Sequence, residues 1–236
     1  MSMTTLMNKV KLLILDYSVD QFETELIESC VATEIEKLSL HITHEGSFPK
    51  DLFSQGFTHI IHSGSSLSIN DSAPFTKQAV ELIRWAKHHH LWQMGICYGH
   101  QLLALALVGK HAVQASSNGF EAGWRTVHFS KEAQRLFNIQ EVEKVWQHHF
   151  DEVIQCPEGS EILASNNHSF IQAYINYEQR LLGTQFHPEF DQNKGNAFFR
   201  KDRKLLEKNH FNLAEILADG PGFDSRKVVF GFFLNN

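Results

Sequence analysis

The sequence predicts an α/β fold, with a doubly wound, mostly parallel central sheet flanked by helices. In the first half, short apolar runs alternate with stretches whose apolar residues recur at helical spacing, which is the order of β-α-β units. Some of the strand-like runs, such as Lys11–Leu15, are largely apolar, as strands covered on both faces are. A chain of 236 residues with 42% hydrophobic content can form one well-cored domain. Since no linker-like segment divides it, we expect a single domain over residues 1–236.

The first half supplies most of the predicted parallel sheet. The run Lys11–Leu15 predicts the first buried strand, because it is too short for a membrane span and Asp16 follows it. Apolar residues at helical spacing predict one helix over Val19–Cys30 and another over Phe75–Lys87, which Pro74 precedes. The remaining elements of this half are expected as strands at Ile35–Ile42, His59–His62 and Trp92–Ile96 and as a helix at Gln101–Val108.

The second half is richer in strands, and helices return near its end. Strands are expected at Thr126–Phe129, Glu143–Gln147, Glu161–Ala164, Phe170–Asn176 and Leu181–Gln185, and helices at Ala197–Asn209 and Leu213–Ala218. The chain ends on the apolar segment KVVFGFFLNN. We expect this segment to pack on the domain rather than to bind a partner.

Composition excludes several classes of function. The net charge is -6 and no long basic run occurs, so neither nucleic acid nor an anionic membrane surface is an expected partner. Three widely spaced cysteines predict no disulfide framework and favour a reducing, cytoplasmic setting. No HExxH or paired CxxC motif occurs among the fifteen histidines, and we expect no metal and no cofactor. The run His88–His90 fits a helix end, where it complements the helix dipole.

The segment MGICYGHQLLALAL carries the strongest chemical signal. A predicted strand ends at Ile96, Gly95 and Gly99 flank Cys97, and an apolar helix follows. This G-x-C-x-G pattern is the cysteine counterpart of the nucleophile elbow, whose tight turn needs small neighbours. The helix start is expected to favour the thiolate, and the amide of Tyr98 is placed to form part of an oxyanion hole. Cys97 is therefore the predicted nucleophile.

A base for this thiol is expected in the segment LLGTQFHPEF. His187 and Glu189 follow a predicted strand there, and Pro188 restricts the backbone between them. Glu189 can orient the imidazole while its other nitrogen faces Cys97, which completes a Cys-His-Glu triad. Cys30 and Cys156 lack such surroundings, and we interpret both as structural.

These motifs resemble those of the class I glutamine amidotransferases, most closely the amidotransferase domain of GMP synthases and its stand-alone relatives. The family pattern G-x-C-x-G-x-Q is present as residues 95–101, and Q-F-H-P-E as residues 185–189. The segments NGFEAGW, QHHFDEV and GSSLSIND resemble the family's G-x-E-x-G-W, W-H-G-D and oxyanion-loop segments. The resemblance covers a core of about residues 9–190, with a C-terminal helical extension over residues 191–236.

The resemblance implies a flavodoxin-like domain that hydrolyses glutamine through a γ-glutamyl thioester on Cys97. It implies that the amide at Gly64 shares the oxyanion with Tyr98, and that Gln101 helps to hold the substrate. It further implies that the loop containing Gly119, Glu121 and Gly123 lines the amino-acid end of the site. An ordinary polar residue at Gln101 and a solvated carboxylate at Glu121 remain the alternatives at those two positions.

Three departures from the family pattern leave the function open. Ser66 stands where the oxyanion loop usually has proline, and Phe150 stands at the W-H-G-D glycine. No synthetase domain and no GxxxxGK[ST] phosphate loop is present in the sequence, which favours a glutamine-hydrolysing subunit or stand-alone enzyme that acts with a synthetase partner. The alternatives are a γ-glutamyl peptidase or hydrolase, whose leaving group is larger than ammonia, and a non-catalytic regulatory protein.

Overall fold

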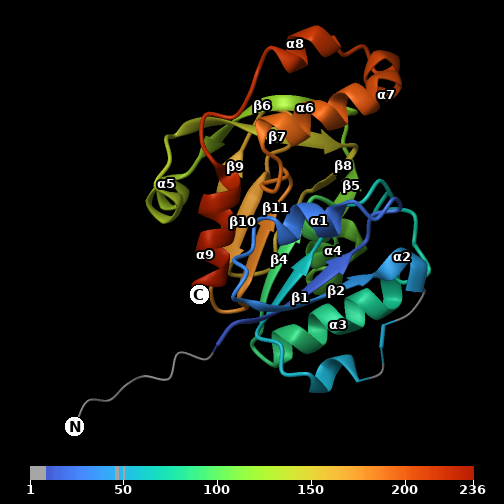
Figure 1. The fold of residues 1–236 in the computed structure, drawn as a ribbon, viewed down its shortest axis with the longest axis vertical. Coiled ribbons are helices and arrows are strands. Elements are labelled where there is room, and N and C mark those ends of the chain that lie inside the picture. Colours follow the sequence, from blue (N-terminus) through green and yellow to red (C-terminus); the bar gives the residue numbers. More distant parts are fainter. Residues whose placement is uncertain (1–8, 46–47, 50) are drawn as a thin grey trace.

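A nine-stranded sheet forms the centre of the computed structural model, which describes residues 9–45, 48–49 and 51–236 (Figure 1). The strand order is β2-β1-β3-β4-β11-β10-β9-β6-β7, and β5 and β8 form a separate pair. The strands are β1 (Lys11–Asp16), β2 (Glu36–His41), β3 (His59–His62), β4 (Trp92–Ile96), β5 (Val113–Ala115), β6 (Glu121–Phe129), β7 (Val142–His149), β8 (Asp151–Val153), β9 (Glu161–Ser165), β10 (Ala173–Asn176) and β11 (Leu181–Thr184).

The large sheet has a parallel half and an antiparallel half. Strands β2, β1, β3, β4 and β11 pair in parallel, whereas β10, β9, β6 and β7 extend the sheet in antiparallel fashion. The register aligns Leu15 with His62, His62 with Gly95, and Gly95 with Gly183. The carboxyl ends of β1, β3, β4 and β11 therefore meet at one edge, where α/β proteins place their sites.

Helices cover both faces of the sheet. On one face, α3 (Thr76–His88) and α4 (Tyr98–Leu107) pack against the alternate β1 residues Leu13 and Leu15. On the other face, α1 (Glu23–Glu28), α5 (Lys131–Phe137) and α9 (Gly231–Leu234) share a core with Leu12 and Ile14. The doubly wound, mostly parallel architecture predicted from the sequence is thus confirmed.

The C-terminal helices differ from their predicted bounds. Helices α6 (Gln192–Lys201), α7 (Arg203–Lys208) and α8 (Leu213–Leu217) gather at one end of the molecule, beside β6 and β7 (Figure 1). The helix expected over Ala197–Asn209 starts earlier, because the Asp191 carboxylate accepts the Lys194 N–H at 2.8 Å and caps α6. It also breaks at Asp202, whose φ of -94° and ψ of 19° leave the helical region.

Several shorter elements were not expected from the sequence or have other bounds. The unexpected ones are α2 (Ile42–Glu45), α5, β5, β8 and single 3-10 turns at Leu52–Ser54 and Lys110–Ala112. Helix α4 begins at Tyr98 rather than Gln101, and α1 is shorter than Val19–Cys30. Strand β6 begins at Glu121 rather than Thr126, and β10 lacks the first residues of Phe170–Asn176.

The apolar tail packs on the domain, as expected. A π-helical turn at Arg226–Phe230 leads into α9, and Val229, Phe230 and Phe233 are buried in the core that α1 and α5 share. In Figure 1 the tail runs beside β9 and β10. Within the described ranges, no helix has the length and apolar character needed to cross a bilayer.

Candidate active site

Cys97 occupies a strained turn between β4 and α4. Its φ of 49° lies in the left-handed region that side chains seldom adopt, and its N–H donates to the Thr184 carbonyl at 2.8 Å. A Cβ at Gly95 would lie 2.5 Å from the backbone of Gly99, and one at Gly99 would lie 2.1 Å from the His62 oxygen. Both flanking positions therefore require glycine, as expected for a nucleophile elbow.

The thiol of Cys97 is protonated at rest, contrary to the expectation from the helix start. Burial, together with the carboxyl groups of Glu23 and Glu189, raises the pKa of Cys97 far above its ordinary value. The Tyr98 amide lowers this pKa, but it does not offset the burial of a side chain that is only 4% exposed. A base must therefore remove the proton during the reaction rather than find a thiolate already formed.

His187 and Glu189 form a tightly held pair at the end of β11. The ring Nδ1 of His187 lies 2.5 Å from Oε1 of Glu189, and both side chains are buried. The His187 N–H donates to the Trp146 carbonyl at 3.0 Å, and the Trp146 ring meets the imidazole edge to face. Burial lowers the pKa of His187 to about 4, so the ring is neutral and able to accept a proton.

The thiol and His187 are not hydrogen-bonded in the described part of the chain. Instead, Nε2 of Gln185 lies 3.6 Å from the Cys97 sulfur. Because Glu189 engages Nδ1, the Nε2 atom of His187 is the one left for proton transfer. Catalytic hydrogen bonds are often long before substrate binds, and the facing ends of β4 and β11 are adjacent in the sheet.

The loop after β3 brings the expected oxyanion residue Gly64 beside the base. A Cβ at Gly64 would lie 2.7 Å from Cε1 of His187 and 3.0 Å from Oε1 of Glu23. Only glycine therefore allows His187 to lie so close to this loop. Ser63, the preceding residue, accepts the Gly99 N–H through its carbonyl at 3.0 Å, which ties the loop to the start of α4 and to Tyr98.

Asp151 holds the rest of this loop in place of the family's proline. Its Oδ2 accepts from the Ser68 hydroxyl at 2.6 Å and from the Ile69 N–H at 3.1 Å, and its Oδ1 accepts from Asn70 at 2.9 Å. Ser65 also donates to the Tyr17 carbonyl at 2.8 Å. Serine at position 66 therefore does not leave the loop without fixed contacts.

A cavity of about 230 Å³ opens beside Cys97. Gln101 lines it and donates to the Asp151 carbonyl at 2.9 Å and to Gln185 at 3.2 Å, so its amide is fixed rather than solvated. Gly119 and Gly123 do not line it. Gly119 lies in an exposed turn with φ of 76°, and Gly123 has φ of 109° and faces Ile216.

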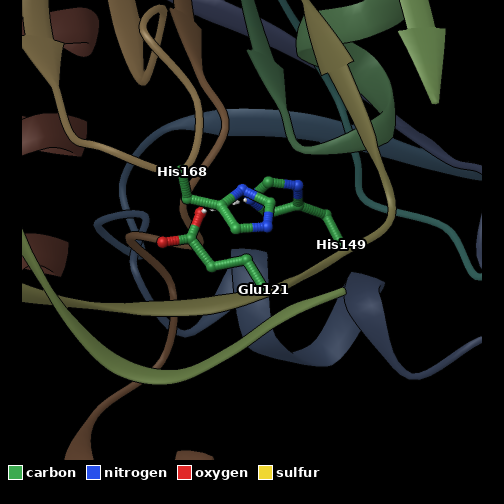
Figure 2. Close-up of side chains that lie close together, drawn as sticks. All are labelled: Glu121, His149 and His168. Carbon is green, nitrogen blue, oxygen red and sulfur yellow. Dashed lines mark hydrogen bonds and ion pairs between the residues drawn. The ribbon is translucent and has the colours of Figure 1, made fainter. Parts of the chain in front are cut away.

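Glu121 forms a separate buried cluster with His149 and His168 (Figure 2). Its carboxylate accepts from His149 at 2.9 Å, Asn166 at 2.6 Å and Gln172 at 3.0 Å. Burial opposes it, but His149, His168 and Asn166 together lower the pKa of Glu121. The ligand atoms of Glu121 and the two histidines lie within 4.8 Å of one another, close enough to hold a cation, but the three donors already satisfy the carboxylate.

Glu121 is connected to the active site through His149. The second ring nitrogen of His149 lies 3.0 Å from the Asp151 carbonyl, which Gln101 also contacts. His149 lines the Cys97 cavity, whereas Glu121 does not. The alternative of a solvated carboxylate at Glu121 is wrong, because this side chain is 4% exposed.

Sequence analysis did not identify Glu23 as part of the site. This residue begins α1, is 2% exposed, and places Oε1 3.9 Å from Nδ1 of His187. Leu26 and Ile27, three and four residues further along, are buried on the same helix face. That spacing is the signal in the sequence, because it puts a carboxyl on the buried side of the helix.

A second cavity, of about 420 Å³, is lined by His187. Its wall includes Phe22 from the segment after β1, Trp146 from β7, and Phe198 and Leu205 from α6 and α7. Ser65, Ser66, His148 and Leu205 line both cavities, so the two adjoin. Cys30 and Cys156 line neither cavity, although the Cys30 thiol lies 3.9 Å from the Glu189 carbonyl, and burial raises the pKa of both to about 12.

Comparison with known proteins agrees with the fold. The family model "Glutamine amidotransferase class-I" matches residues 13–204, and the chain belongs to this family of enzymes. A subunit of the glutamine-hydrolysing GMP synthase from Sulfolobus acidocaldarius is 35% identical over 125 residues, which are 52% of this chain and 65% of that relative. The corresponding subunit from Saccharolobus solfataricus is 32% identical over 133 residues, 56% of this chain and 68% of that relative.

Other relatives match over a smaller share of their length. The glutamine-hydrolysing GMP synthase of Clostridium novyi is 34% identical over 126 residues, which are 53% of this chain but 23% of that enzyme. Among solved structures, a glutamine amidotransferase from Thermotoga maritima superposes with a TM-score of 0.77 at 18% identity and covers 96% of both chains. One from Methylobacillus flagellatus gives a TM-score of 0.74 at 20% identity, with 96% and 91% covered. These structures share the fold.

Proposed function

We propose that the chain hydrolyses the side-chain amide of glutamine through a γ-glutamyl thioester on Cys97. His187 takes the thiol proton as the sulfur attacks the amide carbon, and the C–N bond breaks as that proton passes to the leaving nitrogen, which departs as ammonia. Water, deprotonated by the same histidine, then attacks the thioester, releases glutamate and restores the thiol. Glu189 orients His187 throughout.

The observation that carries the proposal is the arrangement of three strand ends. Cys97 is held in a left-handed turn after β4, and the His187–Glu189 pair follows β11. Gly64 follows β3 and lies next to both His187 and Glu23 of α1. The amides near Gly64 and at Tyr98 are assigned to the oxyanion. Gln101 is assigned to substrate binding because it lines the Cys97 cavity with a fixed amide.

A covalent trap tests this function. The intact chain, incubated with a glutamine analogue that carries an electrophile at the side-chain carbonyl, is expected to gain one adduct, located at Cys97 by peptide mass spectrometry. The variant Cys97→Ala is expected to gain none, and Cys30→Ala serves as the control that keeps the adduct. An adduct that persists in Cys97→Ala, or wild-type protein that stays unmodified while remaining folded, contradicts the proposal.

The ammonia acceptor is proposed to reside on a synthetase partner. The relatives from Sulfolobus and Saccharolobus are each named as one subunit of a GMP synthase, which denotes a divided enzyme. Glutaminase activity should therefore be measured with the chain alone and with candidate synthetases. Stimulation by one synthetase and not by others identifies the partner, and equal activity under all conditions favours a stand-alone enzyme.

The cavity beside His187 supports a second candidate, the hydrolysis of γ-glutamyl compounds other than glutamine. The leaving nitrogen must receive its proton from His187, so the leaving group lies on that side. A cavity of about 420 Å³ there, lined by Phe22, Phe198 and Leu205, is much larger than ammonia requires. Turnover of glutamine compared with γ-glutamyl-phenylalanine separates the two candidates. Filling the cavity with Phe198→Trp, at a position that lines this cavity but not the one beside Cys97, is expected to slow the peptide more than glutamine.

A further inference from the structure

The imidazole of His187 faces two carboxyl groups. Glu189 Oε1 lies 2.5 Å from Nδ1 and Glu23 Oε1 lies 3.9 Å from the same atom. The three ligand atoms of this cluster lie within 4.8 Å of one another, and the two carboxyl side chains are 2% and 0% exposed. One acceptor is sufficient to orient a histidine, so the second buried carboxyl needs its own explanation.

The remaining oxygens of the two carboxyls point to a shared proton. Oε2 of Glu23 and Oε2 of Glu189 are both buried, and neither has a hydrogen-bond donor among the described residues. No lysine or arginine of the described chain pairs with either side chain. Two ionised carboxylates this close would repel each other in a buried site. A proton held between them turns one into a donor and satisfies both oxygens.

The electrostatics of the site agree with this arrangement. Burial, reinforced by Glu189, raises the pKa of Glu23 well above its ordinary value. Burial also raises the pKa of Glu189, to about 8, while a hydrogen bond from Glu23 acts in the opposite direction and favours the ionised form of Glu189. Because Glu189 also accepts Nδ1–H of His187, the shared proton is assigned to Glu23 and the negative charge to Glu189.

We propose that Glu23 is a positioning residue whose protonated carboxyl donates a hydrogen bond to Glu189, which in turn accepts Nδ1–H of His187. The inference rests on the proposed role of His187 as the base for Cys97. In this chain of contacts, Glu23 favours the carboxylate form of Glu189, and Glu189 in that form keeps the proton of the neutral imidazole on Nδ1. Nε2 is then free to take the thiol proton.

The fold places Glu23 for this role. The Asp16 carboxylate, at the end of β1, accepts from the N–H and the hydroxyl of Thr24 at 2.8 Å and 2.7 Å, which fixes the first turn of α1. The absence of a side chain at Gly64 leaves the space that Glu23 and His187 both occupy, because a Cβ there would lie within 3.0 Å of each.

The test compares two substitutions of nearly equal size. Glu23→Gln keeps a donor for Glu189, whereas Glu23→Met keeps the length but has no donor. Glu25→Met is the matched control, because Glu25 lies on the same helix and is exposed. The rate of alkylation of Cys97 by iodoacetamide is measured from pH 5 to 10, with the modified peptide identified by mass spectrometry. This reaction needs no glutamine, so it is independent of the substrate assigned above.

We expect Glu23→Met to react at least about tenfold more slowly at neutral pH than Glu23→Gln, and Glu25→Met to match the wild type. Without a donor at position 23, Glu189 loses its proton only at a higher pH. The rise of the alkylation rate with pH therefore shifts upward by about one pH unit, which corresponds to that tenfold change. The other groups that face the cluster and the thiol, namely Asp16, His148, His149 and Asp151, are the same in every variant.

Three outcomes overturn the inference. Equal slowing in Glu23→Gln and Glu23→Met shows that an ionised Glu23 is what matters, and wild-type rates in both show that Glu23 only packs. A loss of rate on adding a chelator to the wild type shows that the cluster holds a cation instead of a proton. Thermal unfolding confirms that each variant folds. If the alkylation pattern is as expected but glutamine is not hydrolysed, the proposed function fails and the role of Glu23 stands.

Discussion

Two clusters of buried histidine and glutamate side chains lie in this molecule, and their hydrogen bonding differs. Around Glu121, donors from His149, Asn166 and Gln172 satisfy the carboxylate, and the pKa of Glu121 is lowered. Around His187, Glu23 and Glu189 each keep a buried oxygen without a donor among the described residues. Burial raises the pKa of both of these carboxyls.

The difference separates a structural cluster from a reactive one. A satisfied buried carboxylate stabilises the fold, because removing it strands its donors. Buried groups that lack partners and have displaced pKa values are typical of sites where protons move. The first cluster contacts the carbonyl of Asp151, whose side chain holds the loop after Gly64. The second cluster contains the proposed base itself.

The largest expected effect is on turnover, from breaking the reactive cluster. His187→Asn should lower kcat for glutamine by about 10³-fold or more, because it removes the proton carrier. The melting temperature should change by only a few degrees. His168→Asn, in the other cluster, is the control and should lose less than tenfold. Comparable losses of kcat in the two variants would contradict the division of roles.

The next largest effect is on stability, from breaking the structural cluster. Glu121→Leu should lower the free energy of unfolding by about 3 kcal/mol, since it leaves His149 and two amides without their acceptor. Urea unfolding followed by fluorescence measures this loss. Glu132→Leu is the control, because its exposed pair with Arg135 is screened by solvent and should change stability little. If the two substitutions cost the same, Glu121 does not carry the role assigned to it.

The sequence predicts the parts of these clusters that come from neighbouring residues, but not the contacts between residues far apart in the chain. The elbow at Cys97 and the His187–Glu189 pair are local patterns, and the sequence predicts them together with the sheet that carries them. It does not predict Glu23, because the contact of this residue with His187 joins positions far apart in the chain and exists only once α1 packs on the edge of β1.

The C-terminal helices and the substrate loop show the same limit. The caps at Ser130 and Asp191, which start α5 and α6, are short motifs that the sequence contains, but the periodicity of apolar residues alone does not reveal them. Resemblance assigns Gly119 and Gly123 to the substrate pocket, yet neither lines the Cys97 cavity, and Gly123 lies within β6 and faces Ile216. The wall contributed by Leu205 is not predictable, since it depends on how α7 folds back over the site.

The third expected effect is a difference in pH dependence between the clusters. The folded pKa of Glu189 is raised to about 8, so its contribution to stability is present below its unfolded pKa and lost as pH rises through 8. Glu189→Gln should therefore gain on the order of 4 kcal/mol over the wild type between pH 5 and pH 8.5. Glu121→Gln should show a constant difference there, because the lowered pKa of Glu121 keeps it ionised throughout. Parallel slopes in the two variants would show that the clusters do not differ in this way.

The smallest expected effect tests the contact between the structural cluster and the active-site loop. Ser68→Ala removes one of the hydrogen bonds to Asp151 and leaves those from Ile69 and Asn70. Since one such bond contributes about 1 kcal/mol, KM for glutamine should rise by roughly threefold to fivefold, with kcat unchanged. Steady-state kinetics measure this, with Ser72→Ala, an exposed position just beyond the loop, as the control. A fall in kcat instead of a rise in KM would mean that the loop acts on the oxyanion rather than on substrate binding, because only an interaction specific to the transition state lowers kcat.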